Sequence, residues 1–208
     1  MQLYFSPLSC SLASRITAYE TAAAVDLVEV DPTTKRTSTG ADYREIHPLG
    51  LVPTLVADDG ARLTENVAVL LYLADRAPAA ALAPRDGLAR TRLVQWLSFI
   101  ATELHKSFAP LFDPAAPDAV QAYQRARLAP RLAHVDAHLA GQPWLVDGYS
   151  VADAYLFAIL NWTQVTAIPL ADYPALAAFH RRALERPAVA RAFAEERALY
   201  LAERARAS

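Results

Sequence analysis

The contrast between the two halves of this 208-residue chain restricts its fold more than any other feature. The first eighty residues mix short β-like runs with helical patterns, whereas nearly everything after Gly87 has helical spacing interrupted by Pro and Gly. Alanine and leucine are abundant and glycine occurs only 6 times, which also favours helix. We therefore expect an α/β domain over residues 1–80 and an all-α domain over residues 87–208, joined by a proline-containing linker.

The N-terminal half predicts a strand–helix–strand unit followed by a hairpin. Residues 2–5 alternate in polarity as a strand does, residues 11–23 have helical spacing, and residues 27–30 are β-prone. Together they have the size of a parallel βαβ crossover, about thirty residues. Residues 52–56 and 61–63 then flank an Asp-Gly pair, which signals a tight hairpin turn.

Helical spacing accounts for most of the remaining chain. Thr64 is placed to N-cap a helix over residues 65–76. Ser150 and Asp153 have the spacing of a capping box, with Asp in place of the usual Glu. Apolar periodicity and helix-opening prolines predict further helices over residues 88–112, 119–139, 173–185 and 187–204, and one that begins after Ser150.

Composition and charge exclude several classes of function. A net charge of −2 gives no electrostatic reason to expect nucleic acid or an acidic membrane as a partner. The start lacks the features of a secretory signal and no stretch has eighteen uncharged apolar residues, so we expect a cytoplasmic protein. The single cysteine excludes an intramolecular disulfide and a multi-thiolate metal site. His134 and His138 share a helix face without a third ligand, so we expect no metal.

Cys10 is the first candidate for chemistry, because it lies where the first strand leads into the first helix. Backbone N–H groups and the positive end of the helix dipole at that point favour a thiolate. Such a thiolate can accept hydrogen bonds from a bound thiol, form a mixed disulfide, or act as a nucleophile. Ser9 and Ser11 flank it and could donate to the sulfur anion. The alternatives are a small buried apolar residue for Cys10 and simple helix caps for the two serines.

Three further segments of the N-terminal half could hold a peptide-like ligand. A cis bond before Pro53, uncommon in proteins, would leave the backbone of Val52 free to pair with it as an added strand. Glu65 and Asn66 open a helix, where first-turn amides suit a carboxylate and the Glu65 side chain suits an ammonium. Lys35 lies in a loop and could meet a second carboxylate. Each segment has a structural alternative. Pro53 could mark a simple turn, the acidic start of the helix could only stabilise the helix dipole, and Lys35 could be a solvated lysine.

The helix over residues 88–112 carries one polar stripe. Ser98, Thr102 and His105 fall at i, i+4 and i+7 and share a face, with Glu103 and Lys106 next to it. Such a face indicates a lined cleft or a subunit contact, and a solvated stripe is the alternative.

Five segments, in this order and spacing, resemble the beta-class bacterial glutathione S-transferases: SPLSCSLASR, HPLGLVPTL, TENVAVLLYLAD, WLSFIATELHK and DGYSVADAYLF. The resemblance covers nearly the whole chain. The cysteine after the first strand and the histidine of TELHK are features that separate this class from the tyrosine and serine classes. The implied fold is a thioredoxin-like glutathione-binding domain over residues 1–80 and an all-helical domain over residues 87–208 that holds the electrophile.

The resemblance also implies roles for single residues of the N-terminal half. Cys10 contacts or covalently traps the glutathione sulfur, Pro53 is cis, and the Val52 backbone pairs with the cysteinyl part of glutathione. Lys35 meets the glycyl carboxylate. The γ-glutamyl end is held by Glu65 and Asn66.

On the helical side, the resemblance implies that Ser98, Thr102, Glu103 and His105 approach glutathione or Cys10. Some of these residues would come from a partner subunit, so a homodimer is expected. His105 and Lys106 would border the electrophile pocket. The chain departs from the family at Ser98, where an amide is common, and at Leu51, where a polar residue is common. The departure at Ser98 affects a ligand contact, whereas the one at Leu51 does not, because the backbone of Val52 carries the pairing.

The function implied is conjugation of the glutathione thiolate to small hydrophobic electrophiles, with Cys10, His105 and Ser11 as the catalytic residues and glutathione as co-substrate. Three physiological roles are compatible with this activity: detoxification, catabolic dehalogenation and redox repair. Two other functions stay open. One is glutathione-dependent thiol–disulfide exchange of the monothiol glutaredoxin type, and the other is non-catalytic binding of hydrophobic ligands.

Overall fold

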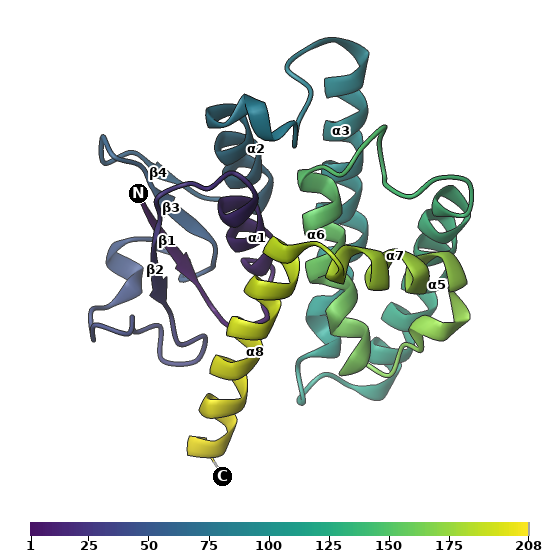
Figure 1. The fold of residues 1–208 in the computed structure, drawn as a ribbon. Helices are drawn as coiled ribbons and strands as arrows, with labels where there is room; N and C mark the ends of the chain where they lie inside the picture. Colours follow the sequence, from purple (N-terminus) through teal and green to yellow (C-terminus); the bar gives the residue numbers. More distant parts are fainter. Residues whose placement is uncertain (208) are drawn as a thin grey trace. The chain divides into compact units, whose positions relative to one another are not determined.

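The computed structural model describes residues 1–207 and divides the chain into two compact units (Figure 1). The first unit combines Met1–Ala81 with the C-terminal segment that begins at Arg186, and the second is Leu82–Glu185. The boundaries expected from sequence, 1–80 and 87–208, assign the C-terminal segment to the helical domain instead.

The first unit contains a four-stranded mixed sheet. Its strands are β1 (Gln2–Phe5), β2 (Asp26–Glu29), β3 (Thr54–Val56) and β4 (Arg62–Leu63). The order is β2-β1-β3-β4, with β1 parallel to β2 and antiparallel to β3. The parallel crossover and the hairpin expected from sequence are therefore both present. The α/β fold of the thioredoxin-like type is confirmed.

Successive residues of β1 point to opposite faces of the sheet, and each face has its own core. Leu3 is fully buried with Leu55, Val69 and Leu73 on the side of the helices α1 (Leu12–Glu20) and α2 (Asn66–Arg76). Tyr4 packs on the other face with Tyr43. The helices of this unit are α1 (Leu12–Glu20), α2 (Asn66–Arg76), α8 (Pro187–Ala207) and the short 3₁₀ turns η1 (Tyr43–Glu45) and η2 (Pro78–Ala80).

The C-terminal helix α8 packs against α1 through charged side chains, which is why it groups with the N-terminal unit (Figure 1). Arg15 of α1 pairs with Glu195 of α8. Arg186 donates to Glu20 at 2.7 and 2.9 Å. Glu196, which is fully buried, accepts a hydrogen bond from the backbone N–H of Leu8 at 2.8 Å. The last helix therefore reaches the loop that precedes α1.

One expected cap is wrong. The N-cap of α2 is Glu65, not Thr64, and no side chain caps this end of the helix. Glu65 has φ 64° and ψ 120°, outside the helical region, so the helix cannot begin before Asn66. The helix expected over residues 11–23 is shorter than predicted, since α1 runs from Leu12 to Glu20.

The second unit is entirely helical within the described residues. The expected helix over 88–112 is present but changes pitch, since a π-helical segment, η3, follows α3 and precedes α4 and η4. The bounds are α3 Gly87–Phe99, η3 Ile100–His105, α4 Lys106–Phe108, η4 Ala109–Leu111, α5 Asp118–Leu139, α6 Val151–Leu160, η5 Asn161–Gln164, η6 Leu170–Asp172 and α7 Pro174–Leu184.

Helix α6 forms the centre of this unit, because all of its residues are buried. It begins with the expected capping box of Ser150 and Asp153. The Asp153 carboxylate accepts hydrogen bonds from the backbone N–H groups of Leu145 and Ser150, both at 2.9 Å, and from the Ser150 hydroxyl at 2.7 Å. In the part of the chain that the structure describes, no helix has the length and apolar character needed to cross a membrane.

Candidate functional site

Cys10 lies in a loop that serine side chains hold in shape between β1 and α1. The Ser11 hydroxyl accepts from the Ser6 N–H at 3.2 Å, lies 2.7 Å from the Ser9 hydroxyl, and donates to the Ser6 carbonyl at 3.3 Å. Ser11 is fully buried. The contacts of its hydroxyl therefore organise the loop around Cys10.

The Cys10 thiol is turned toward the segment before β3. Its Sγ atom donates to the carbonyl of Val52 at 3.3 Å, and the residue is 7% exposed. The bond between Val52 and Pro53 is cis, as expected. The Val52 N–H has no hydrogen-bond partner among residues 1–207. The structure thus brings Cys10 into contact with the backbone that was expected to recognise a peptide.

The start of α2 reaches the same loop through Asn66. This side chain is buried, and its amide donates to the Cys10 carbonyl at 3.0 Å while its oxygen accepts from the Ser14 hydroxyl at 2.7 Å. The side-chain amide thus braces the loop, while the backbone N–H of Asn66 lies in the first turn of α2, where N–H groups have no partner within the helix. The neighbouring Glu65 is exposed and has a positive φ, a conformation that clusters at ligand sites in proteins.

Lys35 also has a positive φ, 59°, and its half-buried stem lies against Gly50. A Cβ atom added to Gly50 would lie 3.1 Å from the Lys35 Cδ atom. The Lys35 carbonyl accepts from the N–H of Tyr43 at 2.8 Å. Tyr43 and Ser14 are residues that the sequence did not single out, because both look like ordinary core positions.

The remaining candidates lie in the second unit, on α3, η3 and α4. Ser98 and Thr102 are exposed, and the Thr102 hydroxyl donates to the Ser98 carbonyl at 3.0 Å. Glu103 accepts from Arg131 of α5 at 2.6 Å, with Arg127 at 3.9 Å. Within one chain the Glu103 carboxylate is therefore part of an ion-pair cluster rather than an open ligand group.

His105 is held among aromatic rings. Its Nδ1 atom lies 2.6 Å from the Tyr155 hydroxyl, and its ring centroid lies 5.1 Å from that of Trp162. Burial lowers the pKa of His105 to about 4, and the positive charge of Lys106 adds to this effect. His105 is therefore neutral near pH 7. Lys106 itself is exposed.

Trp162 also extends this aromatic cluster along the unit. Its ring lies 5.7 Å from Phe108 and 5.2 Å from Phe112, with the latter 45% exposed. This partly open apolar surface beside His105 suits an apolar molecule. The sequence did not point to Trp162 or Phe112.

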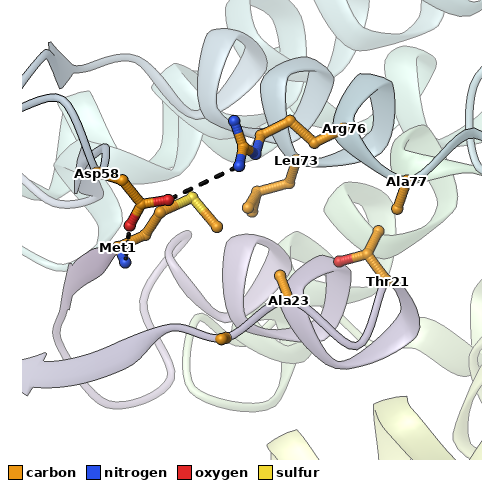
Figure 2. A pocket seen from close by; sticks show the side chains of 8 residues that line it. Met1, Thr21, Ala23, Asp58, Leu73, Arg76 and Ala77 are labelled. Atoms are coloured by element: carbon orange, nitrogen blue, oxygen red, sulfur yellow. Dashed lines mark hydrogen bonds and ion pairs between the residues drawn. The ribbon is translucent and has the colours of Figure 1, made fainter.

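A cavity of about 310 Å³ lies elsewhere in the first unit. Met1, Leu73 and Arg76 are among the residues that line it (Figure 2). In it the N-terminal ammonium donates to Asp58 at 2.7 Å, and Arg76 lies 3.7 Å from the same carboxylate. None of the residues expected to bind glutathione or the electrophile lines this cavity. Among residues 1–207, no group of three or more His, Cys, Asp or Glu side chains could hold a metal ion.

Comparison with known proteins gives a consistent result over both halves. Residues 9–76 match the family model of the glutathione S-transferase N-terminal domain, and residues 99–187 match that of the C-terminal domain. Glutathione S-transferase GstA of Escherichia coli O157:H7 is 42% identical over 198 residues, which is 94% of this chain and 98% of the relative.

Solved structures agree with this result. The glutathione S-transferase of a sphingomonad, complexed with glutathione, has a TM-score of 0.92 and 43% identity, and the match covers 94% of this chain and 98% of that chain. The bacterial beta-class enzyme of Sphingomonas chungbukensis has a TM-score of 0.91 at the same identity and the same coverage. The chain therefore belongs to the glutathione S-transferase family, in its bacterial beta class.

Proposed function

We propose that this protein conjugates the thiolate of glutathione to small hydrophobic electrophiles. The observation that carries the proposal is the convergence of three backbone segments on Cys10. Its thiol contacts the Val52 carbonyl, its own carbonyl is held by Asn66, and its loop is braced by Ser11. A thiol beside a free N–H and a helix start is suited to recognise the sulfur end of a thiol tripeptide.

The proposed roles in glutathione binding follow from this arrangement. Cys10 contacts the glutathione sulfur, and the Val52 N–H donates to the cysteinyl carbonyl. The backbone N–H of Asn66, with the exposed carboxylate of Glu65, holds the γ-glutamyl end. Lys35 pairs with the glycyl carboxylate. Ser11 acts through the loop, because its hydroxyl is occupied there.

The proposed electrophile site is the aromatic cluster around His105. Neutral His105 accepts or donates a hydrogen bond without charge, and Trp162 and Phe112 supply apolar contact area. Lys106 borders this surface. In the reaction the glutathione thiol proton goes to solvent, the sulfur forms a bond to the electrophilic carbon, and the leaving group departs with its electron pair.

The assembly and setting are part of the same proposal. We propose a cytoplasmic homodimer with a role in detoxification, in which Ser98, Thr102 and Glu103 are presented to glutathione of the partner subunit. In this assembly Glu103 would have to exchange part of its contact with Arg131. The oligomeric state can be measured by light scattering, and a monomer at micromolar concentration would contradict this part.

The first experiment combines mass spectrometry with kinetics. After incubation with oxidised glutathione, a mixed disulfide can form only on Cys10, because the chain has 1 cysteine. Protein alkylated beforehand is the control. We expect the adduct, glutathione conjugation to an aryl halide, and reduced but measurable conjugation by Cys10→Ala.

Each alternative function predicts a different result. Turnover of a glutathionylated disulfide without aryl-halide conjugation would indicate thiol–disulfide exchange. Tight binding of a hydrophobic dye without turnover of any electrophile would indicate a binding protein. Absence of both the adduct and glutathione binding would refute the glutathione site.

A further inference from the structure

The peptide group between Leu51 and Val52 is anchored on one side and open on the other. The Leu51 carbonyl accepts a hydrogen bond from the Tyr43 hydroxyl at 2.8 Å. The N–H of the same peptide group is that of Val52, which has no partner within the described residues. A peptide group is planar, so fixing the direction of its C=O also fixes the direction of its N–H.

The proton of Tyr43 is directed toward that carbonyl by a second buried hydroxyl. The Thr54 Oγ1 atom lies 2.6 Å from the Tyr43 oxygen, and both residues are 0% exposed. A phenol has one proton to donate. Because Tyr43 uses this proton to donate to the Leu51 carbonyl, the Thr54 hydroxyl must donate to the Tyr43 oxygen. The result is a chain of hydrogen bonds from Thr54 through Tyr43 to Leu51.

Tyr43 remains a donor across the range in which a glutathione enzyme would be assayed. Burial raises the pKa of Tyr43 to about 12, although the hydrogen bond with Thr54 lowers this pKa in part. The hydroxyl is therefore protonated at neutral and mildly alkaline pH. Its ring is fixed as well, by packing against Tyr4 at a centroid distance of 5.4 Å.

The backbone of Tyr43 holds a second part of the same site. Its N–H donates to the Lys35 carbonyl at 2.8 Å. Tyr43 thus connects the loop that carries Lys35 with the peptide that presents the Val52 N–H. Neither contact requires Tyr43 to touch a ligand.

We propose that Tyr43 is a positioning residue for glutathione, which holds the Val52 N–H in its binding direction through the Leu51 carbonyl. The hydrogen bond to the carbonyl also polarises the peptide group and makes its N–H a stronger donor. This inference rests on the proposed glutathione site.

The test is Tyr43→Phe, which keeps the ring and removes the hydroxyl. We expect the KM and Kd for glutathione to rise about three- to tenfold, which is the change in affinity that the loss of one hydrogen bond typically causes. The kcat at saturating glutathione and the KM for the electrophile stay unchanged. Tyr4→Phe is the matched control, because its hydroxyl contacts Gln2 at 3.3 Å and not this peptide.

Thr54→Val provides a second variant in case Tyr43→Phe folds poorly. It leaves the Tyr43 hydroxyl in place but removes the group that directs its proton, so we expect a smaller rise in the same KM. An unchanged KM for glutathione in both variants, or an equal rise in Tyr4→Phe, would overturn the inference.

A spectroscopic measurement separates this inference from the proposed function. In Tyr43→Phe the backbone order parameter of the Val52 amide falls in the free protein, whereas in Tyr4→Phe it does not. An unchanged order parameter refutes the positioning role even if glutathione binds. Failure of the wild-type protein to bind glutathione refutes the proposed function instead.

Discussion

Removing the Asp153 carboxylate tests how strongly one buried side chain holds the second unit together. Asp153→Ala deletes the acceptor of three hydrogen bonds, two from backbone N–H groups and one from the Ser150 hydroxyl. The N–H groups of Leu145 and Ser150 then lose their partner beside a fully buried helix. Burial raises the pKa of Asp153 to about 6, so the carboxylate is ionised at pH 8.

The expected loss of stability follows from these contacts. A buried donor left without a partner costs about 1–3 kcal/mol, so two of them, with a lost cap, destabilise the chain by about 4 kcal/mol. For a protein of this size that lowers the Tm by roughly 8–16 °C.

Urea and thermal unfolding followed by far-UV circular dichroism at pH 8 measure both quantities. Asp147→Ala is the control, because Asp147 is an exposed carboxylate of the same loop. A loss below about 1 kcal/mol in Asp153→Ala, or an equal loss in the control, would refute the reasoning.

Two further substitutions test other parts of the first unit. Burial raises the pKa of Glu196 from 4.5 to about 8. Between these two pH values the folded chain keeps a proton on Glu196 that the unfolded chain releases, so the free energy of unfolding falls as the pH rises toward about 8. We expect Glu196→Gln to flatten this fall in urea unfolding between about pH 5 and 8, and an equally steep fall would contradict it. Gly50 has a positive φ, and a Cβ added there by Gly50→Ala would press against the stem of Lys35. Because this displaces Lys35, we expect the KM for glutathione to rise several-fold at constant kcat. An unchanged KM would separate Lys35 from glutathione binding.

Local patterns predicted the elements of the fold well, because each depended on neighbouring residues. The alternation in β1, the Asp-Gly turn of the hairpin and the box of Ser150 and Asp153 all act within a few residues. The cap at Thr64 failed because Glu65 has φ 64° and ψ 120°, a conformation that its residue type does not signal, so the helix begins at Asn66. Apolar periodicity predicted one α-helical pitch over residues 88–112 and missed the π-helical segment Ile100–His105, for which no residue pattern was recognised.

Site residues could be predicted where the residue type itself indicates the chemistry. Residues whose role depends on contacts with distant parts of the chain could not be predicted. Cys10 and Pro53 stand out in the sequence, and the structure brings Cys10 to the segment before Pro53. The role of Tyr43 depends on a hydroxyl that meets a carbonyl eight residues away. The ion pair of Glu103 with Arg131 joins two helices, and no local pattern encodes such a meeting.

The hydrogen bond from Leu8 to Glu196 has a consequence for synthesis of the chain on the ribosome. The loop that presents the only cysteine is held by a residue translated 188 positions later. Until that residue leaves the exit tunnel, the nascent N-terminal unit lacks α8 and the Glu196 side chain that anchors its loop. A contact between residues this far apart in sequence slows folding, because the thiol loop stays unanchored until the distant helix has been made and has docked.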